Sequence, residues 1–244
     1  MSHGFEARVI SRRVFLAGAA FAAAALDAPS ILSAPKKVPT LLDHILLGCN
    51  DLDAGIAFVE ERTGVRAVFG GVHPGAGTRN ALLSLGRNHY LEIIAPDPQQ
   101  PASADARDLK SLEEPVLVGW AVHPGDIQQF AARLKEQGIA ATGPNPGSRK
   151  RLDGRVLNWQ TLVLKDDAGG LLPFFIEWGA DALHPSVDAP QGCSLTLFEA
   201  ATPSPTLLMK QADQLQIDLP VTQSKTPHLH AIITGPQGQL DVTF

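Results

Sequence analysis

The stretch LDHILLGCNDLDAGIAFVEERTG, residues 42–64, decides the fold of this chain. Its apolar first part predicts a buried strand that holds one histidine, His44. Asp51 is placed to cap a helix that ends at Gly64, because glycine readily adopts the left-handed conformation that closes a helix. Three further strand-like segments follow at residues 65–73, 78–86 and 89–96. The predicted order of elements is βαβββ.

The same order returns twice. Residues 115–141 predict a strand and a helix capped by Asp126 and ended by Gly138, and residues 154–164 and 170–179 predict strands. A third, shorter copy begins at Ser194, with a helix near 205–215 and a terminal hairpin that turns at 235–238. Because one curved sheet of four strands cannot bury both of its faces, these units are expected to pack into a continuous α+β architecture.

The quoted stretch, together with GGVHPGAGTRNALLSLGRNHYLEIIAPDP, GRVLNWQTLVL and LLPFFIEWG, resembles the glyoxalase-like branch of the vicinal oxygen chelate superfamily. The resemblance implies paired βαβββ modules that form a cupped sheet, here residues 40–185. The third copy, residues 193–244, is assigned as an additional, partial βαβββ module. Ligands to a divalent metal are expected from the first and last strands of each module.

Ionisable residues on apolar strands carry the predicted site. His44 and Glu92 match the first two metal-ligand positions and Glu177 the fourth, with Glu92 and Glu177 also candidates for the catalytic base. Burying a carboxylate without a partner is costly, which favours a shared cation. The third ligand position falls on Gly119, which has no side chain. Histidine and carboxylate ligands suit Zn, Mn, Fe or Ni.

Substrate contacts are predicted around a glycine-rich loop. His73 precedes this loop and Thr78 and Asn80 follow it, and all three are candidates for binding substrate, His73 also as a replacement ligand. Trp120 is a fourth candidate, as a cavity wall. The alternative for His73 is a turn histidine bonded to the backbone. For Asn80 the alternative is a polar residue on the strand surface, and for Trp120 it is a position in the core.

Residues 1–35 resemble a twin-arginine export signal, with Arg12 and Arg13 before a short apolar run. The run is too short to span a bilayer. The mature protein is therefore expected in the periplasm, with membrane contact only through an uncleaved signal. A buried N-terminal helix is the alternative.

Charge and cysteine content restrict the partners. A net charge of −5 gives no electrostatic reason to expect nucleic acid. The basic cluster Arg149-Lys150-Arg151 is either a solvated loop or a contact for an anionic substrate group. Cys49 and Cys193 are expected as free thiols, with one disulfide as the alternative. The terminal hairpin could mediate homodimerisation through an exposed edge.

The predicted function is a metal-dependent enzyme that acts on a small substrate with two neighbouring oxygens. Isomerase and lyase chemistry fit such a site. Oxygenolytic ring cleavage fits least well, because the position of its usual second histidine is occupied by Gly119. The alternative is a non-catalytic periplasmic protein that binds a small ligand in the same cup. Fold alone does not separate the two.

Overall fold

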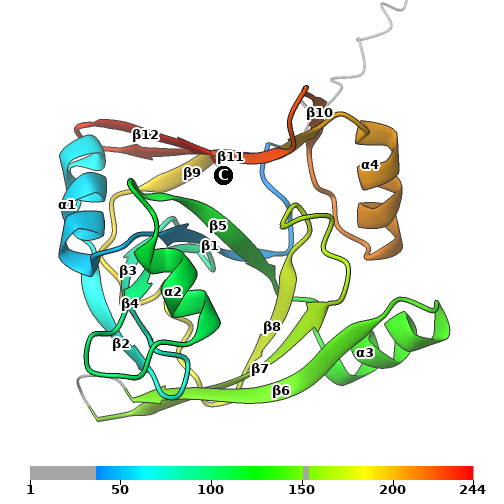
Figure 1. Cartoon of the computed structure of the whole chain (residues 1–244), viewed down its shortest axis with the longest axis horizontal. Helices are drawn as coiled ribbons and strands as arrows, with labels where there is room; N and C mark the ends of the chain where they lie inside the picture. Colours follow the sequence, from blue (N-terminus) through cyan, green and yellow to red (C-terminus); the bar gives the residue numbers. More distant parts are fainter. Residues whose placement is uncertain (1–36, 151–153, 244) are drawn as a thin grey trace, which may run out of the picture. The chain divides into compact units, whose positions relative to one another are not determined.

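A computed structural model describes residues 37–150 and 154–243 (Figure 1). The predicted export signal at residues 1–35 lies outside this part of the chain. Within the described ranges, no helix combines the length and apolar character needed to cross a membrane.

Two βαβββ modules form the body of the structure, as predicted. The first contains β1 (Leu42–Gly48), α1 (Leu52–Thr63), β2 (Val68–His73), β3 (Thr78–Ser84) and β4 (Tyr90–Pro96). The second contains β5 (Val116–Val122), α3 (Ile127–Glu136), β6 (Ala141–Lys150), β7 (Val156–Leu164) and β8 (Phe174–Trp178), and α2 (Ala104–Lys110), which was not predicted, connects the two modules.

The predicted helix caps are confirmed. The Asp51 side chain accepts a hydrogen bond from the backbone N–H of Ala54, and Gly64 closes α1 with φ = 79°. Asp126 accepts from the N–H groups of Gln128 and Gln129 at the start of α3. These side chains satisfy N–H groups that have no partner within the helix.

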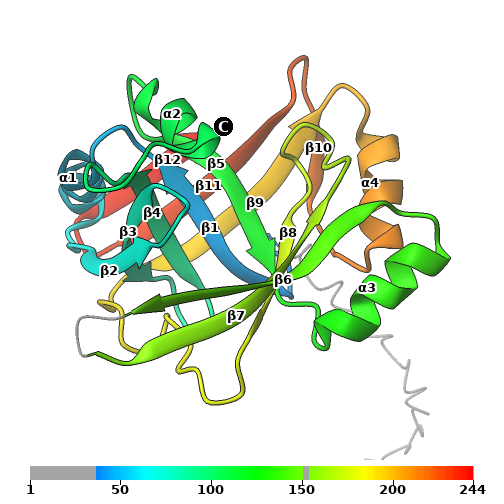
Figure 2. The same cartoon turned by 60° about the horizontal axis from the view of Figure 1, so that its bottom comes forward.

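The modules join into one eight-stranded sheet of order β2-β3-β4-β1-β5-β8-β7-β6. Its centre is the antiparallel pair β1 and β5, so each module contributes one half. The edge strands β2 and β6 approach each other, which curls the sheet around an interior (Figure 2). Strand β6 was not predicted because it contains Pro144 and Pro146. An edge strand tolerates proline, since one side of it needs no partner.

The C-terminal unit forms a separate sheet. Its elements are β9 (Ser194–Thr202), α4 (Pro205–Gln214), β10 (Val221–Gln223), β11 (His228–Gly235) and β12 (Gly238–Thr243), in the predicted order. The strand order is β10-β9-β11-β12, with β9 parallel to β10. In the first module, by contrast, the first strand runs parallel to the last, β4. The third unit thus repeats the order of elements but pairs its strands differently.

This second sheet shares its core with the outer face of the curled sheet. Trp120 of β5 is fully buried, packs on Phe198 of β9 at 5.0 Å between ring centroids, and donates its indole N–H to the carbonyl of Leu171. Trp120 therefore belongs to the core, and the prediction that it contacts substrate is wrong. Cys49 and Cys193 are buried free thiols, as expected.

The terminal hairpin also contacts the end of α1. Thr63 is the last residue of α1, so its carbonyl has no N–H donor within the helix. It accepts a hydrogen bond from the backbone N–H of Gln237. Gly235 lies against the same carbonyl, and a Cβ atom there would collide with it. This contact needs glycine because no side chain fits between the hairpin and the helix.

We predict that Gly235→Ala lowers the free energy of unfolding by about 1–3 kcal/mol, the usual cost of overpacking. Gln239→Ala, at an exposed position of the same hairpin, should change it by less than about 0.5 kcal/mol. Denaturant unfolding monitored by circular dichroism measures both. Equal stability of the two variants would show that the hairpin is not held against α1.

Candidate active site

A cavity of about 390 Å³ lies on the inner face of the curled sheet. This volume is typical of small-molecule sites. The first module supplies most of its polar side chains and the second supplies most of its apolar wall. The lining residues are His44, Leu46, His73, Ala76, Thr78, Asn80, Tyr90, Glu92, Ile94, Arg149, Trp159, Thr161, Val163, Phe174, Ile176 and Trp178.

Asn80 connects the charged groups of the cavity. Its amide nitrogen donates to Glu92 Oε1 at 2.8 Å and lies 3.2 Å from His73 Nε2, and its oxygen accepts from Arg149 Nη1 at 2.9 Å. His73 Nδ1 in turn lies 2.9 Å from the Thr78 hydroxyl. The structure thus brings together His73, Thr78 and Asn80, all predicted to bind substrate, with Glu92.

A bulge in β1 adds a carboxylate that alternation along the strand does not predict. Leu42 and His44 lie opposite the adjacent residues Val122 and Ala121 of β5, so Asp43 is the extra residue. A bulge changes the direction of the side chain it carries. As a result Asp43 Oδ1 lies 2.7 Å from Nδ1 of its neighbour His44, and both side chains are buried.

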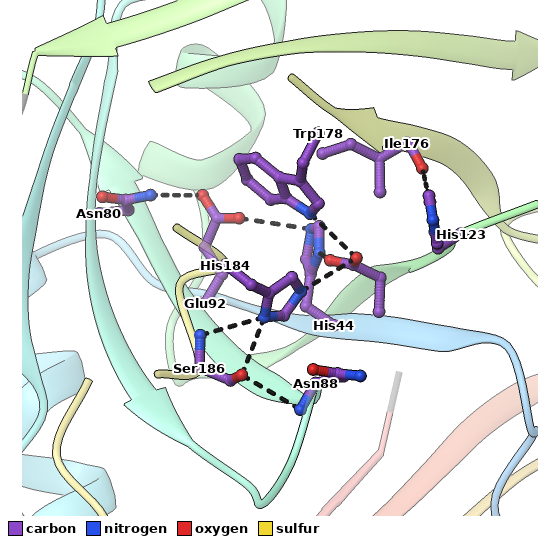
Figure 3. Close-up of polar contacts among 10 residues, drawn as sticks. His44, Asn80, Asn88, Glu92, His123, Ile176, Trp178, His184 and Ser186 are labelled. Atoms are coloured by element: carbon purple, nitrogen blue, oxygen red, sulfur yellow. Dashed lines mark hydrogen bonds and ion pairs between the residues drawn. The ribbon is translucent and has the colours of Figure 1, made fainter. Parts of the chain in front are cut away.

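Asp43 receives two more hydrogen bonds from distant parts of the chain, from Trp178 and His184, which are both labelled in Figure 3. Trp178 Nε1 donates to its Oδ2 at 3.0 Å, and His184 Nε2 lies 3.2 Å from the same oxygen. The backbone N–H of Ser186 donates to His184 Nδ1, which leaves the His184 proton on Nε2, facing Asp43. His184 comes from the loop after β8 and was missed because no motif marks it.

Both carboxylates are ionised at neutral pH. Burial raises the pKa of Asp43, but the hydrogen bonds from His184 and His44 outweigh this effect and hold the pKa well below its ordinary value. Burial likewise opposes ionisation of Glu92, while electrostatic interaction with His73 and His44 and the Asn80 hydrogen bond lower its pKa. An ionised carboxylate only accepts hydrogen bonds, so His44 carries a proton on Nδ1 and donates it to Asp43.

The other ring nitrogen of His44 faces the cavity. His44 Nε2 lies 3.5 Å from Glu92 Oε2, and the imidazole stacks on Tyr90 with 4.5 Å between ring centroids. Burial raises the pKa of Tyr90 well above its ordinary value, so the phenol stays neutral. Burial also lowers the pKa of His73, which favours its neutral form.

Glu177 does not join this cluster, and its prediction as metal ligand and catalytic base is wrong. Phe174, Ile176 and Trp178 of β8 line the cavity, so Glu177 points to the other face. There its carboxylate accepts from the backbone N–H of Ile127 at 3.1 Å, at the start of α3. An anionic group is stabilised at the N-terminus of a helix.

The donors present do not fit the four-ligand metal site that the resemblance implied. In the first module, Glu92 of β4 pairs with the residue of β1 that lies two positions after His44. In the second module, Phe174 of β8 pairs with the residue of β5 that lies two positions after Gly119. The second module therefore offers Gly119 and Phe174 where the first has His44 and Glu92. His73 Nε2 lies 3.2 Å from the Asn80 amide nitrogen and 3.6 Å from Glu92 Oε1. Within residues 37–150 and 154–243, no group of three His, Cys, Asp or Glu side chains is arranged to hold a metal ion.

We predict that Asp43→Asn lowers the free energy of unfolding at neutral pH by about 2–4 kcal/mol, because it places an amide N–H₂ against donors in a buried site. The folded-state pKa of Asp43 is below its unfolded value of about 3.9, so its contribution is complete above that pH and is lost as the pH falls below it. The difference between wild type and variant should therefore shrink in acid.

Unfolding in denaturant at pH 7 and near pH 3 checks this prediction. Asp53→Asn, at an exposed position of α1, is the control and should cost less than about 1 kcal/mol at either pH. A difference for Asp43→Asn that grows in acid would contradict the assigned ionisation.

A family model and a solved structure agree with this fold. A family model described as a glyoxalase-like domain matches residues 42–215. A hypothetical protein from Staphylococcus aureus has 15% identity over 82% of this chain and 84% of its own, with a TM-score of 0.57. Methylmalonyl-CoA epimerase from Mycobacterium tuberculosis has 24% identity over 57% of this chain and 87% of its own, with a TM-score of 0.42. No curated protein matches the sequence. The chain belongs to the glyoxalase-like domain family.

Proposed function

We propose that the chain is an enzyme that moves a proton on a carbon next to a carbonyl group of a small substrate, as isomerases and lyases do. The observation that carries this proposal is the pairing of His44 Nε2 with the Glu92 carboxylate, 3.5 Å apart, at the wall of a largely apolar cavity. Positioned imidazole and carboxylate groups are the usual general acids and bases.

His44 and Glu92 are held in place by different residues. The Asp43 carboxylate fixes His44 with Nδ1 protonated, which leaves Nε2 to accept a proton and stabilises the imidazolium that then forms. Glu92 is ionised and held by Asn80, so it can also accept a proton from substrate. Because Nε2 and Oε2 are close, one group can take the proton and pass it to the other.

The geometry favours transfer on one face of the substrate. Inversion of a carbon centre by two bases requires an acid–base group on each side of the carbon. The residues of β8 that line the cavity are Phe174, Ile176 and Trp178, and none of them carries an acid–base group of this kind. Removal and return of the proton on the same side, or elimination of a leaving group, are the reactions that this arrangement supports.

The alternative function is a non-catalytic binding protein. Its support is the apolar second module, where Gly119 and Phe174 replace a potential ligand pair. A purely binding cup would not require the Asp43, His44 and Glu92 array, which is costly to bury.

We predict that Glu92→Gln slows proton exchange at the reacting carbon by about 100-fold or more, the usual contribution of general acid–base catalysis. The assay incubates the enzyme with 2-oxo acids, 2-hydroxy acids and 1,2-dicarbonyl compounds in D₂O and follows deuterium incorporation by NMR. Glu177→Gln, the same change on the outer face, should retain the exchange. Equal loss in both variants, or exchange unaffected by Glu92→Gln, would contradict the proposal, and the absence of exchange with every compound favours the binding protein.

Metal dependence was predicted from the family resemblance and has its own test. Because the donors do not fit a four-ligand site, protein purified without chelator is expected to contain much less than one equivalent of Zn, Mn, Fe or Ni by elemental analysis. One equivalent in the wild type and none in His44→Ala would overturn the assignment of His44 to acid–base chemistry.

A further inference from the structure

Arg149 gives the cavity a buried positive charge. It lies on β6, the edge strand of the second module, and its side chain is only 4% exposed although it lines the cavity. Its Nη1 donates to Asn80 Oδ1 on β3, so the guanidinium bridges the two halves of the sheet. Among the described residues, its hydrogen-bond partner is this neutral amide, and no carboxylate lies within ion-pair distance.

The neighbouring backbone leaves room for the guanidinium. Gly70 of β2 faces both groups, and a Cβ atom at this position would collide with Arg149 Nη1 and Asn80 Oδ1. The absence of a side chain at Gly70 therefore lets Arg149 reach the first module. Burial of an arginine is costly unless it is paired. A guanidinium whose partner is neutral retains N–H donors suited to an anionic oxygen pair.

Another part of the cavity lining is apolar. Trp159 and Trp178 contact each other with their ring centroids 5.6 Å apart, and Val163 and Ile176 extend the same wall. A ligand that fills both parts needs an anionic end and an apolar body.

We propose that the substrate is a small carboxylic acid with an apolar or aromatic body, whose carboxylate binds Arg149. The proposal rests on the proposed function and specifies its substrate class. Asn80 lies between Arg149 and Glu92, so a carboxylate held by Arg149 places its adjacent carbon toward the Glu92 and His44 pair. The carbon beside the carboxyl group is the one whose proton is removed in the proposed reaction.

Ligand binding tests this proposal without any turnover. Two of the three tryptophans, Trp159 and Trp178, line the cavity, and Trp120 lies in the core, so intrinsic fluorescence reports on the site. The probes are phenylacetate, its neutral analogue phenylacetamide, and acetate, which lacks the apolar body. Phenylacetate should bind at least about tenfold more tightly than phenylacetamide, because its hydrogen bonds to Arg149 are charge-assisted, and at least about tenfold more tightly than acetate, because acetate has no apolar body to bury.

Variants then locate the contact. Arg149→Met should weaken phenylacetate at least about tenfold and leave phenylacetamide unchanged, and Arg149→Lys should restore part of the loss. Arg87→Met, which removes an exposed arginine from a second cavity behind Trp178, should change neither affinity. The comparison of acid with amide on the wild type remains decisive even if Arg149→Met fails to fold.

Equal binding of phenylacetate and phenylacetamide, or no saturable change at millimolar acid, would overturn the proposal. Loss of phenylacetate binding in Arg87→Met alone would place the anion in the second cavity and would also overturn it. Glu92→Gln should retain phenylacetate binding while it removes proton exchange. If the enzyme catalyses proton exchange but binds phenylacetate no more tightly than phenylacetamide, the proposed function is retained and this substrate class is refuted.

Discussion

The site depends on one buried carboxylate. Asp43 is the extra residue of a bulge in the central strand β1, and it accepts hydrogen bonds from His44, Trp178 and His184. These partners come from β1, from β8 and from the loop that follows β8. The same interaction therefore orients His44, fixes one wall of the cavity and ties the first module to the second.

The two modules share a fold but supply different kinds of side chain to the cavity. The first supplies His44, Glu92 and Asn80, and the second supplies an apolar wall and one cation, Arg149. The two halves of the sheet therefore line the cavity differently, with the imidazoles and the Glu92 carboxylate in the first module and the Arg149 guanidinium in the second. This asymmetry is the reason why we propose proton transfer on one face of a substrate, and not metal coordination or inversion by two bases.

Much of the fold could be predicted from the sequence, because helix caps such as Asp51 and Asp126 and the alternating apolar strands are local signals. His44 and Glu92 could also be predicted, as lone ionisable residues in apolar strands. The prediction for Glu177 was wrong, because alternation along a strand shows which residues share a face but not which face lies inside. Asp43 and His184 could not be found, because a bulge and a loop contact depend on tertiary pairing. Arg149 was a candidate contact for an anionic group, but the proline-containing strand that brings it to the cavity was not predicted.

The most direct test of the central claim is the tautomer of His44, observed by long-range ¹⁵N–¹H NMR at neutral pH and assigned by comparison with His44→Gln. If the ionised Asp43 carboxylate orients the ring, Nδ1 carries a proton in the wild type. A neutral ring with its proton on Nε2 and none on Nδ1 would show that Asp43 does not accept from His44 and would contradict the account.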